Sequence, residues 1–189
     1  RNDRAQFPAH PSYLKADPLR IDAWREKLKR LGPGLKVGIA WKGGLGKTRA
    51  AVRSAHLSQW GPILSLKNCH FISLQHGKTT ADIEAMAAEG YEVALWEEAL
   101  ADINETTALS SALDLVVTVC NTVVHLSGAL GKPVWVLAPP VPEWRYTLSA
   151  ERMPWYPSSD IYRAKMENAW SETLDAVACR LAQMGRGES

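Results

Sequence analysis

The sequence predicts a doubly wound α/β domain with a mostly parallel, Rossmann-like sheet. Five short apolar segments rich in Val, Ile and Leu are separated by segments with helical periodicity. Most of the apolar segments are continuous rather than alternating, as in strands that are buried on both faces of a parallel sheet. The length of 189 residues suits one ordinary domain, and the hydrophobic content of 46% is enough to build a core. A disordered chain is therefore excluded.

The expected strands and helices alternate along the chain. The strands are expected at residues 35–41, 70–75, 92–96, 115–119 and 133–137. The helices are expected at residues 57–66, 80–89, 104–113, 122–130 and 171–184. The last helix has Ser171 available as its N-cap and places apolar residues at the spacing i, i+3, i+4 and i+7, namely Leu174, Val177, Ala178 and Leu181.

Two segments differ from this pattern. Residues 1–34 contain three early prolines and a charged helix expected at 19–31, which ends at a Gly-Pro-Gly sequence. This segment is expected to be a linker and lead-in helix, and the domain proper is expected at residues 35–189. Residues 139–157 contain five prolines and four aromatic side chains. Such a loop after the carboxyl end of a strand is either a packed cover or a binding loop.

Composition excludes several classes of protein. The net charge of +2 gives no case for binding to nucleic acid or to a membrane surface. No apolar run reaches the roughly 18 residues of a membrane-spanning helix, and residues 1–10 lack the apolar stretch of a signal peptide. The three cysteines suit neither a disulfide framework nor a metal site, so a cytoplasmic location is the simplest expectation. Because the chain begins at Arg1 without an initiator Met, one interpretation is that it is a piece of a longer protein.

The charges are segregated along the chain. Residues 27–78 contain ten Lys or Arg and no Asp or Glu, whereas residues 79–131 contain nine Asp or Glu and no Lys or Arg. A solvated surface normally mixes the two signs. The segregation indicates either chance clustering on exposed faces or an anion site built from the first stretch.

A glycine loop at residues 42–48 follows a strand and precedes a helix, which is a position where backbone N–H groups can hold phosphate. It resembles the phosphate loop of partition-type ATPases, but the standard spacing would require glycine at Trp41. The dinucleotide-binding pattern fails at Arg49. Basic residues interrupt the apolar face of the next helix, which is therefore expected to begin only near Ser54. A merely structural basic loop remains an alternative.

A second candidate lies where the strand at 115–119 runs into Cys120. If Thr122 is the N-cap of the following helix, the free N–H groups of its first turn point into the crevice where open α/β sheets bind ligands. His125 then lies in that first turn. The alternative is a purely capping Thr and a partly buried His, but their combination at a strand-to-helix edge favours a ligand site.

Residues 114–133 resemble the signature of heptosyltransferase-like glycosyltransferases, especially the C-terminal domains that follow tetratricopeptide repeats in bacterial proteins. Shorter pieces resemble other parts of that family in the same order, at residues 37–41, 53–54, 73–75, 143–145 and 154–157. The resemblance spans about residues 13–181.

The resemblance implies a GT-B transferase, with two Rossmann-like domains that face a cleft. This chain resembles the C-terminal half, so residues 35–189 would bind a nucleoside diphosphate sugar. The acceptor site and the usual catalytic base belong to the other half, and no catalytic residue is assigned here. The expected partners are the nucleotide sugar and an upstream acceptor or repeat domain. The resemblance implies neither a metal nor another cofactor.

The diphosphate is expected between the glycine loop and the start of the helix at Thr122, with Lys47 and Arg53 as exposed counter-charges. Glu97, Glu98 or Glu143 could hold a ribose. Many members of the family carry Asp where this chain has Cys120, a weak hydrogen-bond donor. The residues expected to bind the substrate are Lys42, Gly43, Gly44, Lys47, Arg53, Gln75, Cys120, Asn121, Thr122, His125 and Glu143. The main alternative function is a non-catalytic binding or scaffold module of a repeat protein, and a less favoured one is a P-loop ATPase.

Overall fold

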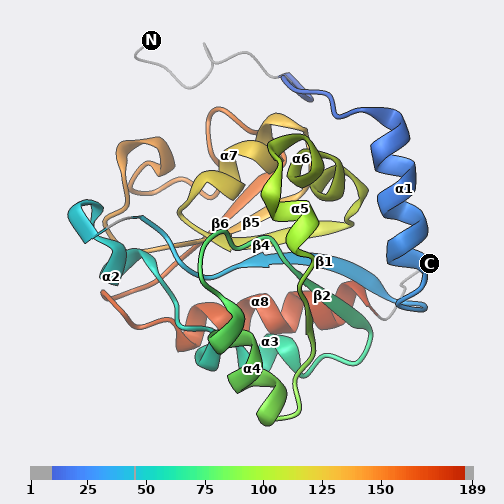
Figure 1. The fold of residues 1–189 in the computed structure, drawn as a ribbon. Coiled ribbons are helices and arrows are strands. Elements are labelled where there is room, and N and C mark those ends of the chain that lie inside the picture. Colours follow the sequence, from blue (N-terminus) through green and yellow to red (C-terminus); the bar gives the residue numbers. More distant parts are fainter. Residues whose placement is uncertain (1–9, 45, 186–189) are drawn as a thin grey trace.

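The computed structural model describes residues 10–44 and 46–185, which form one six-stranded parallel sheet (Figure 1). The strand order is β3-β2-β1-β4-β5-β6. The strands are β1 (Leu35–Ala40), β2 (Cys69–Ser73), β3 (Val93–Ala94), β4 (Leu115–Val119), β5 (Val134–Ala138) and β6 (Ser159–Arg163). The order of the strands reverses between β1 and β4, and open α/β sheets bind ligands beyond the carboxyl ends of the strands at such a point.

Helices cover both faces of the sheet (Figure 1). One face packs against the 3-10 helix η3 (Leu57–Trp60) and the helices α3 (Gly61–Leu64), α4 (Thr80–Ala88) and α8 (Ser171–Met184). The other face packs against α5 (Glu97–Ala101), α6 (Ile103–Ala112) and α7 (Thr122–Ala129). Successive strand residues contribute to opposite faces, as Val116 and Val117 do in β4. Both faces are buried, which explains the continuous apolar strand sequences.

The predicted doubly wound fold is confirmed, and β4 and α8 have the predicted limits. Strand β3 is shorter than predicted, and β6 was not predicted at all. The sequence of β6, Ser-Asp-Ile-Tyr-Arg, carries only two large apolar residues because this strand lies at the edge of the sheet, paired with β5 alone. No helix in the described part of the chain is long and apolar enough to cross a membrane.

Helix α8 begins at Ser171 as predicted, but its predicted N-cap is wrong, and a short helix lies before Ser54 where none was expected. The N-cap of α8 is Trp170 rather than Ser171, and the cap side chain makes no hydrogen bond to the helix. Trp170 is only 1% exposed, so packing of its indole fixes the start of this helix. Helix α2 (Ala50–Arg53) lies before Ser54, where a loop was expected. The Ser54 hydroxyl instead donates to the carbonyl of Ala50, at 2.7 Å, and so closes α2.

The described part of the lead-in segment packs on the domain. Helix α1 (Pro18–Lys29) lies against α6, and its residues Trp24 and Leu28 are buried. The Trp24 indole Nε1 donates to Glu105 of α6 at 2.8 Å. The Lys27 ammonium lies over the stacked rings of Trp24 and Trp96. The domain boundary at residue 34 stays a prediction, and residues 1–9 of the predicted linker lie outside the described residues.

Candidate functional site

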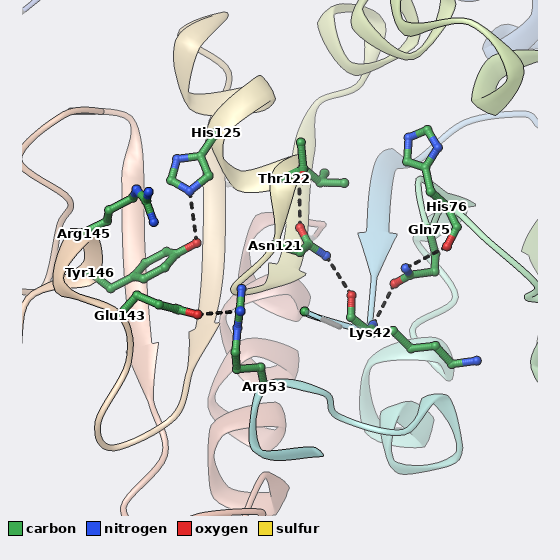
Figure 2. A pocket seen from close by; sticks show the side chains of 12 residues that line it. Lys42, Arg53, Gln75, His76, Asn121, Thr122, His125, Glu143, Arg145 and Tyr146 are labelled. Atoms are coloured by element: carbon green, nitrogen blue, oxygen red, sulfur yellow. Dashed lines mark hydrogen bonds and ion pairs between the residues drawn. The ribbon is translucent and has the colours of Figure 1, made fainter. Parts of the chain in front are cut away.

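A cleft of about 680 Å³ lies at the carboxyl ends of β1, β2 and β4 (Figure 2). Its lining residues are Lys42, Gly44, Arg53, Gln75, His76, Asn121, Thr122, Val123, His125, Glu143, Arg145 and Tyr146. The structure thus brings together eight of the eleven residues expected from the sequence. Gly43, Lys47 and Cys120 are not among the lining residues.

Two amide side chains fix the loop that follows β1. The Gln75 Oε1 accepts from the backbone N–H groups of Trp41 and Lys42, at 2.9 and 2.7 Å. The Asn121 Nδ2 donates to the carbonyl of Lys42 at 3.2 Å. Residues from the ends of β2 and β4 therefore hold the start of the glycine loop between them (Figure 2).

Asn121, not Thr122, is the N-cap of α7. Its Oδ1 accepts from the backbone N–H of Val123 at 2.9 Å and from the hydroxyl of Thr118 at 3.1 Å. Thr122 is the first helical residue and is exposed to the cleft. The predicted helix start at the cleft is confirmed, but the predicted cap was displaced by one residue because Asn is an equally good capping residue.

Lys42 forms an ion pair with Asp82 of α4. Asp82 also accepts from the Trp41 indole Nε1 at 3.0 Å. Partial burial of Asp82 opposes its ionisation, but the hydrogen bonds from Lys42 and Trp41 outweigh this effect and lower the pKa of the carboxyl group. At neutral pH the charge of Lys42 is therefore balanced by a carboxylate of the chain itself.

Arg53 was expected to be an exposed cation, and this expectation is wrong. Its side chain is only 16% exposed, and its Nη1 pairs with Glu143 at 2.6 Å. Its guanidinium also donates to the carbonyl oxygens of Cys120, at 2.6 Å, and Thr48, at 3.1 Å. Through these contacts the Arg53 side chain connects α2 with the end of β4 and with the loop after β5, and it is therefore largely buried.

Gly43 lies under the cleft rather than in its wall. A Cβ atom at this position would stand 2.7 Å from the carbonyl oxygen of Arg53 and 2.8 Å from that of Cys120, so only glycine fits. Lys47 lies on the 3-10 helix η2 (Gly46–Thr48), where it is exposed and outside the cleft lining. The glycine loop therefore reaches the cleft through Lys42 and Gly44.

Cys120 is fully buried at the end of β4, and its thiol donates weakly to the carbonyl of Leu137. Burial, together with the nearby charge of Glu143, raises the pKa of the Cys120 thiol to about 12. Cys120 is therefore a neutral thiol at physiological pH and lies behind the cleft wall.

His125 is half-buried between two tyrosines. Its Nε2 lies 3.5 Å from the hydroxyl of Tyr146, and its Nδ1 lies 3.4 Å from that of Tyr156. Burial and the positive charge of Arg145 lower the pKa of His125, so the imidazole is neutral at pH 7. His125 lies in the first turn of α7, as expected, and lines the cleft.

Four lining residues were missed: His76, Val123, Arg145 and Tyr146. Arg145 and Tyr146 belong to the 3-10 helix η4 (Trp144–Tyr146), inside the aromatic loop for which the sequence left a packed cover and a binding loop equally open. The run of alternating charged and aromatic residues beside Glu143 was the available signal. No three His, Cys, Asp or Glu side chains among the described residues are grouped so that they could hold a metal ion.

Three solved structures of glycosyltransferases resemble this chain. The chain matches E. coli ADP-heptose LPS heptosyltransferase II with a TM-score of 0.57 at 13% identity, over 88% of this chain and 53% of the other. For the glycosyl transferase family 9 protein from Veillonella parvula the TM-score is 0.60 at 12% identity, over 94% of this chain and 54% of the other. For E. coli heptosyltransferase WaaC with ADP-2-deoxy-2-fluoro heptose it is 0.51 at 13% identity, over 82% and 44%. The chain has the fold of the matched part of these glycosyltransferases.

The chain spans about half the length of these glycosyltransferases. It is also 33% identical over 179 residues to the protein FlbA of Caulobacter vibrioides. This alignment covers 93% of this chain and 30% of FlbA. No family model matches the sequence. At identities of 12–13% the structural likeness shows the fold alone.

Proposed function

We propose that this chain is the nucleotide-sugar-binding half of a glycosyltransferase, and that its cleft binds a nucleoside diphosphate sugar. The observation that carries the proposal is the place of the cleft. It lies where the strand order reverses, with the start of α7 in its wall. One enzyme of the same fold was solved with a fluorinated ADP-heptose. A hexosyl or heptosyl donor is therefore the class of substrate proposed.

The chemical contribution of this half is stabilisation of the departing diphosphate. The first N–H groups of a helix and fixed cations both favour the negative charge that develops on the leaving group. The acceptor site and the base that deprotonates the acceptor would come from another domain, since this chain spans only half of the related structures. The proposal includes an upstream acceptor or repeat domain as a partner. It also places the protein in a reducing cytoplasm, which is compatible with its three free cysteines.

One observation favours a second candidate, a non-catalytic binding module. Cys120 stands where a carboxylate is common in the family that the sequence resembles, and its buried thiol is neutral. A module that lacks this carboxylate would bind the nucleotide without transferring the sugar. The two candidates differ in activity, because only the transferase consumes the nucleotide sugar once the missing half is supplied.

Binding is tested by thermal unfolding in the presence of ADP, UDP, GDP or CDP, with EDTA added. A ligand at a hundredfold excess over its dissociation constant stabilises the fold by about 2.7 kcal/mol, which raises the melting temperature by several degrees. We expect such a rise for at least one nucleotide. Absence of any shift at millimolar concentrations of all four would refute the proposal.

A further inference from the structure

Three Lys or Arg side chains line the described cleft, and two of them are already paired. Lys42 pairs with Asp82, and Arg53 pairs with Glu143. The third is Arg145, which has no carboxylate within ion-pair distance among the described residues. Arg145 is thus the lining cation whose charge is left for a ligand.

The backbone of Arg145 is anchored, and its exposed side chain contacts one aromatic ring. Its carbonyl oxygen accepts from the Trp155 indole Nε1 at 3.1 Å, and its guanidinium carbon lies 5.1 Å from the centre of the Trp144 ring. Trp144 in turn packs edge-to-face against Trp155. The next residue, Tyr146, is only 2% exposed and anchors η4 in the core. The anchored backbone and the contact with Trp144 reduce the conformational entropy that Arg145 loses when it binds a ligand.

The surroundings of Arg145 are more positive than negative, because the carboxylate of Glu143 in the same cleft is already paired with Arg53. Figure 2 shows Arg145 and His125 at one end of the cleft, and Lys42 and Gln75 at the other. His125 has a lowered pKa, mainly because of burial and then because of Arg145 and Arg53, which the charge of Glu143 only partly offsets. The start of α7 adds the positive end of a helix dipole to the same cleft.

We propose that the Arg145 end of the cleft is an anion subsite, in which the Arg145 guanidinium binds a phosphate group of the ligand. This inference rests on the proposed function and deepens it: the phosphate belongs to the nucleoside diphosphate. A guanidinium can donate two parallel hydrogen bonds to phosphate oxygens, which provides both charge and orientation. Lys42 and Arg53 are structural cations that shape the cleft, and Lys47 takes no part.

The test compares Arg145→Gln with Arg152→Gln. Both variants remove one positive charge from the same irregular region, but Arg152 is exposed, pairs with Asp160 at 3.0 Å and does not line the cleft. Calorimetric titration with the best-binding nucleoside diphosphate should show a loss of about tenfold or more in affinity for Arg145→Gln. Arg152→Gln should bind as the wild type does. Circular dichroism checks that both variants are folded.

A second readout follows the imidazole of His125 by NMR. A phosphate at Arg145 should raise the pKa of His125, because it opposes the positive charges of Arg145 and Arg53 that face this ring. Glu143, Tyr146 and Tyr156 also face this ring. An unchanged His125 pKa in the saturated complex would place the phosphates elsewhere.

The outcomes separate this inference from the proposed function. If the wild type binds a nucleoside diphosphate and both variants bind equally well or lose affinity equally, the subsite is refuted and the proposed function stands. If no nucleoside diphosphate binds the wild type, the proposed function fails, and pyrophosphate becomes the probe. Pyrophosphate binding that depends on Arg145 would still support the anion subsite, whereas no binding of pyrophosphate would refute it.

Discussion

At the scale of single residues, the cleft is built largely from side chains that the protein uses to hold itself together. The side-chain amides of Gln75 and Asn121 form hydrogen bonds with the backbone of the loop after β1. The Arg53 guanidinium pairs with Glu143 and donates to two backbone carbonyl oxygens. Substitutions of these residues therefore change stability as well as any binding, and the two effects have to be measured separately.

Replacement of Arg53 by Met should destabilise the fold by about 2–4 kcal/mol. The substitution leaves Glu143 partly buried without its counter-ion and frees the carbonyl of Cys120, and breaking such a pair from one side is costly. Urea unfolding gives the free energy. The control is Arg152→Met, whose exposed pair with Asp160 should be worth about 0–1 kcal/mol. Equal costs for the two substitutions would contradict the structural role of Arg53.

The residue types at this site were predictable, but their pairings were not. The predicted substrate-binding residues followed from strand ends and from a family resemblance, which place them at one edge of the sheet. Whether Arg53 faces solvent or Glu143 depends on how the loop after β5 folds back over α2. That loop has no periodicity, so its path, and with it the pairing of Arg53 with Glu143, could not be predicted from the sequence.

At the scale of elements, the start of α7 is the feature that joins the sheet to the cleft. Asn121 caps the helix, accepts from Thr118 of β4 and donates to the loop after β1. One side chain thus connects two neighbouring strands and a helix. Strands β1 and β4, which this side chain connects, were predicted well because both their faces are buried. The cap was not, because Asn121 and Thr122 are both good capping residues.

The substitution Asn121→Ala should lower the free energy of unfolding by about 1–2 kcal/mol, because the N-cap and two further hydrogen bonds are lost. Thr122→Ala is the matched control, since Thr122 is exposed in the first helical position and should change stability by less than about 0.5 kcal/mol. Chemical denaturation of both variants gives the comparison. A larger loss for Thr122→Ala would show that Thr122 is the true cap.

The glycine loop is the second element that bears on function, because its sequence resembles the phosphate loop of an ATPase. A P-loop places its lysine on the phosphates at the start of a long helix. Here Lys47 is outside the cleft lining, and the following helix α2 has only four residues. Its N-cap, Arg49, has a left-handed backbone and makes no side-chain cap hydrogen bond. The strand β4 also runs into Cys120 and Asn121, which are poor ligands for Mg²⁺.

We therefore expect no Mg²⁺-dependent ATP hydrolysis and no preference for ATP over ADP. A steady-state assay of phosphate release, run on the wild type and on Lys47→Ala, tests this expectation. The two proteins should give the same background rate. Turnover that Lys47→Ala abolishes would show that the loop acts as a P-loop.

At the scale of the whole molecule, the described chain is a three-layer structure to which α1 is added at the side. The three layers were predictable from the alternation of strands and helices, and the edge strand β6 was not, because an edge strand needs fewer apolar residues. The packing of α1 on α6 could not be predicted from the sequence either. Most residues of α1 are charged or polar, and only two of them, Trp24 and Leu28, are buried.

The packing of α1 predicts that the lead-in segment unfolds together with the sheet domain. Trp24 is 5% exposed and donates to Glu105, so Trp24→Ala should cost about 3 kcal/mol in a single cooperative transition. Leu19→Ala is the control on the same helix, because Leu19 is 80% exposed and its loss should cost less than about 0.5 kcal/mol. Denaturant unfolding followed by circular dichroism measures both. If residues 1–34 act only as a linker, Trp24→Ala will leave the main transition where it is in the wild type, and the domain will begin at residue 35.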